Sequence, residues 1–177
     1  MTPQMSHISR SSKIAFLAVT EVANLGYCGG LLILNMGGRP VEFHCTAPVS
    51  PNRAQEILYG KTLKEFIICD QIAASLLDKA KSKPSLILID DQVISNLSMQ
   101  VQVPVIFVQD MENGSVLNSS IDTNFELEFA EQQMFGFGDC DQENVADLLK
   151  LFIETLPVTE PFDRIYEAIR EAHKEAA

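Results

Sequence analysis

The sequence predicts an α/β fold with a mixed sheet, in which a three-stranded antiparallel N-terminal meander is followed by alternating helices and parallel strands. Three observations lead to this prediction. Strand-like apolar runs joined by short turns containing Gly and Asn fill residues 13–49. Two further apolar runs, 85–90 and 103–109, are too short for helices and are flanked by helical patterns. Such strands are typical of a parallel pair that is buried on both faces.

The meander consists of predicted strands at 14–22, 27–35 and 40–49. The first is apolar at nearly every position, which is typical of a central strand. Gly29 and Gly30 within the second strand indicate a bulge or the close approach of another element. The third strand alternates, so we expect one face in the core and the other partly in water. The expected core face is Val41, Phe43 and Cys45, and the other face is Glu42, His44 and Thr46.

Two helices are predicted after the meander. Ser50-Pro51 begins the first, because a capping residue followed by proline is typical of a helix start, and this helix ends near Gly60. The segment from Thr62 to Glu65 matches a capping box and predicts a second helix that continues to about Lys81. Pro84 ends this segment before the next strand.

The C-terminal half continues the alternation of strands and helices. A short helical turn at 93–97 separates the two buried strands, and Phe125–Phe129 alternates Phe with Glu, which predicts an edge strand or an arm. Residues 132–141 contain two glycines and are predicted to form a loop. The last two helices are expected at 142–156 and 160–175, where apolar residues recur with helical spacing.

Length and composition indicate one domain. The chain has 177 residues, of which 46% are hydrophobic and 21% charged, as in ordinary globular proteins. We expect residues 1–12 to form a flexible tail and residues 13–177 a single domain. The sequence contains no apolar run long enough to span a membrane. The 4 cysteines lack CxxC spacing, which predicts reduced thiols in a cytoplasmic protein.

The net charge of −11 is unevenly distributed along the chain. Residues 1–60 carry a net charge of +1, residues 61–100 are neutral, and residues 101–177 carry −12. This acidic C-terminal part would repel phosphate backbones, so broad nucleic-acid binding is expected to be unlikely. A small local site in the neutral half is compatible with this distribution.

The order of elements over residues 13–156, a meander, a helix, a strand, a connection and another strand, resembles the ribonuclease H-like fold group, which includes ribonuclease H and endonuclease V. In that group an Asp on the first strand and an Asp at the end of the fourth strand help to bind two divalent metal ions. The resemblance places Asp90 or Asp91 at the second of these positions. The first strand has no Asp, and Thr20 and Glu21 stand near the expected place.

Asp90 and Asp91 are the best candidate metal site in the sequence. Carboxylates after a buried strand lie where α/β sheets bind ligands, and oxygen ligands suit Mg²⁺ or Mn²⁺. Glu21 follows the nearly apolar first strand and could join Asp90 at the ion. The alternative is that the two aspartates cap the following helical turn and that Glu21 marks the solvent end of its strand.

Arg53, Gln55 and His44 are the candidate ligand-binding residues. Arg53 and Gln55 near a helix N-terminus could contact an anion, although a rigid strand-to-helix connection explains the same segment. His44 could take part in a metal site with Cys28 of the neighbouring strand. A zinc site normally requires four ligands, and inert buried thiols are the alternative.

Two functions from different classes remain open on the sequence. The first is a non-catalytic or catalytically degenerate interaction domain, favoured by the missing first-strand Asp and the acidic C-terminal part. The second is a divalent-metal-dependent nuclease or phosphodiesterase of ribonuclease H-like type, with Mg²⁺ or Mn²⁺. The apolar stripe of the last helix, Phe162, Ile165, Tyr166 and Ile169, must be covered either by the chain itself or by a second copy in a homodimer.

Overall fold

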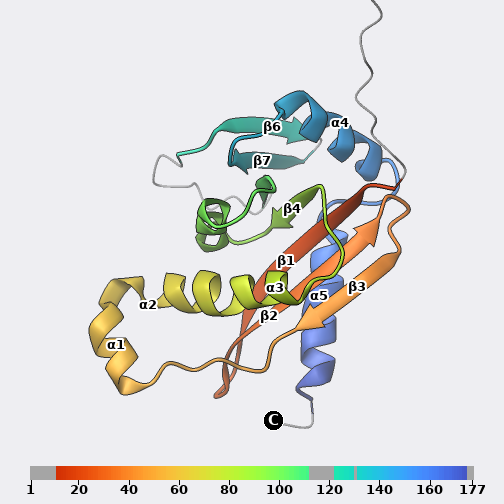
Figure 1. Ribbon diagram of the computed structural model, residues 1–177. Coiled ribbons are helices and arrows are strands. Elements are labelled where there is room, and N and C mark those ends of the chain that lie inside the picture. Colours follow the sequence, from red (N-terminus) through yellow and green to blue (C-terminus); the bar gives the residue numbers. More distant parts are fainter. Residues whose placement is uncertain (1–10, 112–121, 130, 175–177) are drawn as a thin grey trace, which may run out of the picture.

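A computed structural model describes residues 11–111, 122–129 and 131–174. Within these ranges the chain forms a seven-stranded mixed sheet in the order β3-β2-β1-β4-β5-β7-β6. Helical segments cover both faces, with α3 and α5 on opposite sides of β2 (Figure 1). The predicted fold class is confirmed. Ten residues of the predicted 1–12 tail lie outside the described residues.

The N-terminal meander forms the first half of the sheet. Its strands are β1 (Lys13–Val22), β2 (Gly26–Asn35) and β3 (Pro40–Cys45). β1 and β2 pair antiparallel along their whole length, from Lys13↔Asn35 to Val22↔Gly26. The turn between them contains Asn24 at φ 64°, a left-handed conformation that Asn tolerates well. β3 is shorter than predicted, and beyond it Val49 makes an isolated antiparallel bridge to Tyr27.

A bent helical rod follows the meander. It consists of α1 (Arg53–Tyr59), η1 (Gly60–Thr62), α2 (Leu63–Glu65), η2 (Phe66–Ala73) and α3 (Ala74–Lys79). The predicted cap at Ser50 is wrong, because Asn52 and Gln55 form the capping box of α1. The predicted cap at Thr62 is also wrong, because its hydroxyl donates a hydrogen bond to the Tyr59 carbonyl instead.

The middle of the sheet is the predicted parallel pair. β4 (Leu86–Ile89) pairs in parallel with β1 on one side and with β5 (Val105–Asp110) on the other. Between them lies the 3₁₀ segment η3 (Gln92–Met99), which is longer than the predicted turn. Because β1, β4 and β5 are parallel, their carboxyl ends meet at one edge of the sheet.

The prediction of a loop at 132–141 is wrong. Residues Gln132–Phe137 form β7, which lies between β5 and the edge strand β6 (Phe125–Phe129) and pairs antiparallel with both. Gly136, which suggested a loop, has the ring of Phe125 over it, and a Cβ atom there would lie 2.2 Å from Cζ of that ring. The glycine therefore makes room for a cross-strand aromatic contact.

The last two helices cover the sheet face opposite the rod. α4 (Gln142–Ile153) and α5 (Glu160–Ala172) bury their apolar residues against β1, β2, β4 and β5. Phe162, Ile165 and Ile169 of α5 are all nearly inaccessible to solvent. The apolar stripe of the last helix is thus covered by its own chain, which is the first of the two alternatives that the sequence left open.

Strand alternation divides the core into two layers. In β1, Ile14, Phe16 and Ala18 face α4 and α5, whereas Ala15, Leu17 and Val19 face the helical rod. None of the four cysteines forms a disulfide. Among the helices that the structure describes, we find none whose length and hydropathy would let it cross a lipid bilayer.

Candidate functional site at the carboxyl end of β4

Asp90 follows directly after β4, at the edge of the sheet where parallel strands end. Leu86 and Leu88 of β4 belong to the core layer below α4 and α5, so Asp90 continues this face. There it meets α5, and the hydroxyl of Tyr166 donates a hydrogen bond to Oδ2 of Asp90 at 2.5 Å. The other carboxylate oxygen, Oδ1, is buried and has no hydrogen-bond partner among the described residues.

The electrostatics of Asp90 follow from its burial. Burial raises its pKa from 3.8 to about 6, opposed by the hydrogen bond from Tyr166, while the nearby carboxylates of Asp91 and Asp163 add to the increase. Burial and the neighbouring Asp90 also raise the pKa of Tyr166, so its hydroxyl remains protonated and acts as a donor. A cation beside Asp90 would relieve both the desolvation and the carboxylate repulsion.

Asp91 has a different role from its neighbour. Its Oδ1 accepts a hydrogen bond from the backbone N–H of Val93 at 2.9 Å, which caps the start of η3. The capping alternative therefore describes Asp91, whereas Asp90 directs its carboxylate toward α5. Metal binding by either residue stays a prediction.

Glu21 is not brought to Asp90. The last paired residues of β1 and β4 are Leu17 and Ile89, so Ala18 lies level with Asp90. Glu21 is three residues further along β1, roughly 10 Å at 3.3 Å per residue, and alternation directs it to the opposite face. Its side chain is exposed. The register therefore keeps Glu21 and Asp90 too far apart, and on opposite faces, to share the metal ion that the sequence suggested.

Asp163 and Tyr166 are the residues of this site that sequence reasoning missed. Both lie on α5, and Asp163 is close enough to raise the pKa of Asp90 and of Tyr166. The available signal was Tyr166 itself, because a tyrosine in a buried stripe needs a partner for its hydroxyl. Within the described ranges, no three His, Cys, Asp or Glu side chains are grouped closely enough to hold a metal ion. Asp90 supplies one carboxylate oxygen, Oδ1, that is buried without a hydrogen-bond partner among the described residues.

The three candidate ligand-binding residues are placed apart from Asp90. The Arg53 guanidinium pairs with Glu56 at 3.0 Å on the surface of α1, and the Gln55 side chain accepts a hydrogen bond from the backbone of Asn52. His44 lies on β3, where its Nε2 is 2.6 Å from Oε1 of Glu42. These contacts occupy each of the three side chains within the chain's own structure, and their role in binding a ligand stays a prediction.

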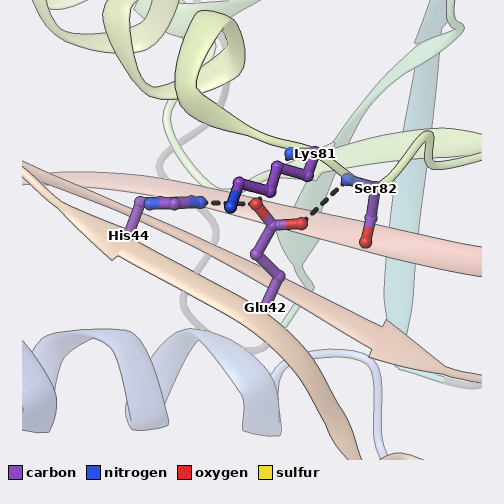
Figure 2. Close-up of polar contacts among 4 residues, drawn as sticks. All are labelled: Glu42, His44, Lys81 and Ser82. Atoms are coloured by element: carbon purple, nitrogen blue, oxygen red, sulfur yellow. Dashed lines mark hydrogen bonds and ion pairs between the residues drawn. The ribbon is translucent and has the colours of Figure 1, made fainter.

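Glu42 is the centre of the polar network on β3. Its carboxylate accepts hydrogen bonds from the backbone N–H groups of Lys81 and Ser82, both at 2.8 Å, as well as contacting His44 (Figure 2). The hydrogen bond with His44 and those from the two backbone groups lower the pKa of Glu42 to about 2. This network attaches the chain after α3 to the edge strand and explains His44 without a metal.

Two further features lie away from Asp90. Cys28 Sγ is 3.4 Å from Nε2 of His173 at the end of α5, and its buried thiol has a raised pKa, which is the inert behaviour expected of buried cysteines. A polar cavity of about 540 Å³ opens beside the start of β5 and the end of β7, at the other edge of the sheet. Asp122, Asn124 and Asp139 are among the residues that line it.

Comparison with solved structures finds the same fold in endonuclease V. The catalytic domain of human endonuclease V is 14% identical, with a TM-score of 0.56 over 92% of this chain and 84% of that chain. Endonuclease V of Ciona intestinalis, in complex with a 23mer DNA containing an inosine followed by a ribo-adenosine, is 12% identical, with a TM-score of 0.56 over 96% and 88%. No protein-family model and no curated protein match the sequence. The chain has the ribonuclease H-like fold, as the element order indicated.

These neighbours correct two expectations drawn from the sequence. The endonuclease V structures above are nucleases, so a non-catalytic interaction domain is the wrong first interpretation and the nuclease alternative fits better. The expectation that nucleic-acid binding is unlikely is also contradicted, because neighbours were solved in complex with DNA. The net charge of the C-terminal segment misled that expectation, since it is summed over many residues and does not describe one site.

Proposed function

We propose that this chain is a divalent-metal-dependent nuclease or phosphodiesterase of ribonuclease H-like type, with its site at the carboxyl end of β4. The observation that carries the proposal is the buried, unpartnered Oδ1 of Asp90 at this position, among the described residues of a fold shared with endonuclease V. A carboxylate oxygen without a partner in a buried place is costly unless a proton or a cation satisfies it.

The acidic surroundings of Asp90 support a cation there. Asp91 and Asp163 add negative charge without binding directly to Asp90, and no described lysine or arginine is ion-paired with any of the three. Asp90 would hold Mg²⁺ or Mn²⁺ through Oδ1, with Asp163 contributing to the field. The ion, when bound, would supply positive charge against the phosphodiester oxygens.

The chain's own residues would then have distinct tasks. Asp90 binds through one oxygen, Tyr166 holds the other oxygen, and Asp91 fixes the start of η3 beside the site. Ala18, level with Asp90 on β1, contributes no acid. With one carboxylate at the ion instead of several, we expect weaker metal affinity than a site with several carboxylate ligands would have.

Cleavage assays test the proposal. Labelled single-stranded RNA, DNA, and DNA containing an inosine followed by a ribo-adenosine would be incubated with the protein in Mg²⁺, Mn²⁺ or EDTA. We expect metal-dependent cleavage of at least one strand, reduced about 100-fold or more by Asp90→Asn. Asp78→Asn, an exposed carboxylate on α3, is the matched control and should cleave like the wild type.

A binding measurement separates the metal site from turnover. An ion that binds only the folded state stabilises it by about 2.7 kcal/mol when present at 100 times its Kd. Millimolar Mn²⁺ should therefore raise the melting temperature of the wild type and of Asp78→Asn, but not that of Asp90→Asn. Equal shifts in all three proteins would exclude Asp90 as the metal ligand, and no shift together with no cleavage of any strand would exclude the function.

A further inference from the structure

Tyr166 lies over Asp90 on α5, a helix that packs closely on the sheet. On either side of it along the helix, Ile165 and Ile169 are buried, and both approach Gly30 of β2. Ile165 comes so close that a Cβ atom on Gly30 would lie 2.4 Å from its Cγ2. This contact fixes the height of the helix over the sheet, and with it the position of the Tyr166 hydroxyl.

The hydroxyl contacts one carboxylate oxygen and leaves the other. The hydrogen bond is made to Oδ2 of Asp90 at 2.5 Å, while Oδ1 is buried and unpartnered within the described part of the chain. A carboxylate anchored through one oxygen can rotate less about its terminal torsion, which is otherwise broad. The orientation of Oδ1 is then restricted as well.

We propose that Tyr166 is a positioning residue that holds the Asp90 carboxylate through Oδ2 and leaves Oδ1 as the oxygen that would bind a metal ion; this inference rests on the proposed function. Metal-ligating carboxylates are themselves commonly held by hydrogen bonds, and loss of such an outer partner typically lowers metal affinity or activity about 10- to 100-fold. Through Tyr166, the helix α5, which is distant in sequence, would set the orientation of the carboxylate at the end of β4.

The packing role of the ring and the positioning role of the hydroxyl can be separated. Tyr166→Phe keeps the aromatic ring in the stripe between the sheet and α5 and removes only the donor. Tyr59→Phe is a matched control, because Tyr59 stacks on Phe66 at 4.0 Å between ring centroids, in the rod and away from Asp90. Both substitutions remove one hydroxyl and preserve one ring.

Three measurements on the full chain test the inference. Mn²⁺ binding would be followed by electron paramagnetic resonance, strand cleavage by kcat and KM, and the Asp90 side-chain conformation by crystal structures without metal. For Tyr166→Phe we expect Mn²⁺ binding about 10- to 100-fold weaker, a lower kcat with KM for the strand unchanged, and an Asp90 carboxylate that leaves its wild-type rotamer. Tyr59→Phe should match the wild type in all three.

The outcomes distinguish this inference from the proposed function. If Tyr166→Phe binds Mn²⁺ like the wild type and Asp90 keeps its rotamer, the positioning role is overturned even when the wild type cleaves nucleic acid. If Asp90 leaves its rotamer in Tyr166→Phe but the wild type neither binds Mn²⁺ nor cleaves any strand, the anchoring of Asp90 is supported and the nuclease function fails.

Discussion

Ile165 of α5 lies directly on Gly30 of β2, where a Cβ atom would come within 2.4 Å of its Cγ2. The preceding residue, Gly29, has the same relationship to the other layer, since a Cβ atom there would lie 2.2 Å from Cγ2 of Ile72 in η2. The paired glycines thus allow helices on both faces to approach the same point of β2. The close approach predicted from these glycines is confirmed.

Gly30→Ala should destabilise the protein by about 1–3 kcal/mol, because an added methyl group must displace α5 or strain its side chains. Gly37→Ala is the control, since a Cβ atom there meets only Asn35 Oδ1 at 3.3 Å. Urea denaturation of both variants gives the free energies of unfolding. Equal values for the two variants would contradict the tight contact between α5 and β2.

Ile165→Ala should cost about 2–5 kcal/mol, because the side chain is fully buried and its removal leaves a cavity beneath α5. The molar mass measured by light scattering should be the same as for the wild type. A variant that keeps its melting temperature but forms a smaller species would show that this helix serves an interface between chains instead.

Asp90 should make stability depend on pH between about 4 and 6. The folded-state pKa of Asp90, about 6, is above the ordinary value of 3.8. Its contribution to the free energy of unfolding is therefore fully present below pH 4 and is lost as the pH rises through 6. The rise in pKa from 3.8 to about 6 corresponds to about 3 kcal/mol. In EDTA, the wild type should lose this much relative to Asp90→Asn over that range; parallel pH profiles of the two proteins would contradict the burial of the charge.

Glu42 predicts a pH dependence of the opposite sign. Its folded-state pKa is lowered to about 2, so its contribution is present above the ordinary value of 4.5 and is lost as the pH falls through 2. Glu42→Gln should lower the melting temperature at pH 7 and speed amide hydrogen exchange at Lys81 and Ser82. Glu126→Gln, on the exposed side of β6, is the control and should change neither.

The order of elements could be predicted because the buried strands and amphipathic helices carry their periodicity in the sequence. It could not be predicted which face of β3 is buried. Val41 and Phe43 were expected in the core, yet they are 44% and 39% exposed, while the side chain of Glu42 is only 14% exposed. The cause is a contact distant in sequence, since the backbone after α3 supplies two donors that hold Glu42 inward.

The candidate site was predictable only in part for a similar reason. Asp90 could be identified because it follows a buried apolar strand, but its partner Tyr166 comes from a helix at the other end of the chain. Whether Glu21 could reach Asp90 depended on register and on which face each residue occupies. Alternation along β1 gives the face, and only the pairing with β4 gives the register.

The central position of β1 has a consequence for how the chain folds. β1 pairs with β2 across a tight turn, but its other edge pairs with β4, whose Leu86 meets Ile14 from about 70 residues later in the sequence. The hairpin can form while the chain is still being synthesised, whereas the parallel pair must await later residues. Until then, one long apolar edge of β1 remains open to strands of other molecules. We therefore expect this topology to be prone to aggregation during synthesis.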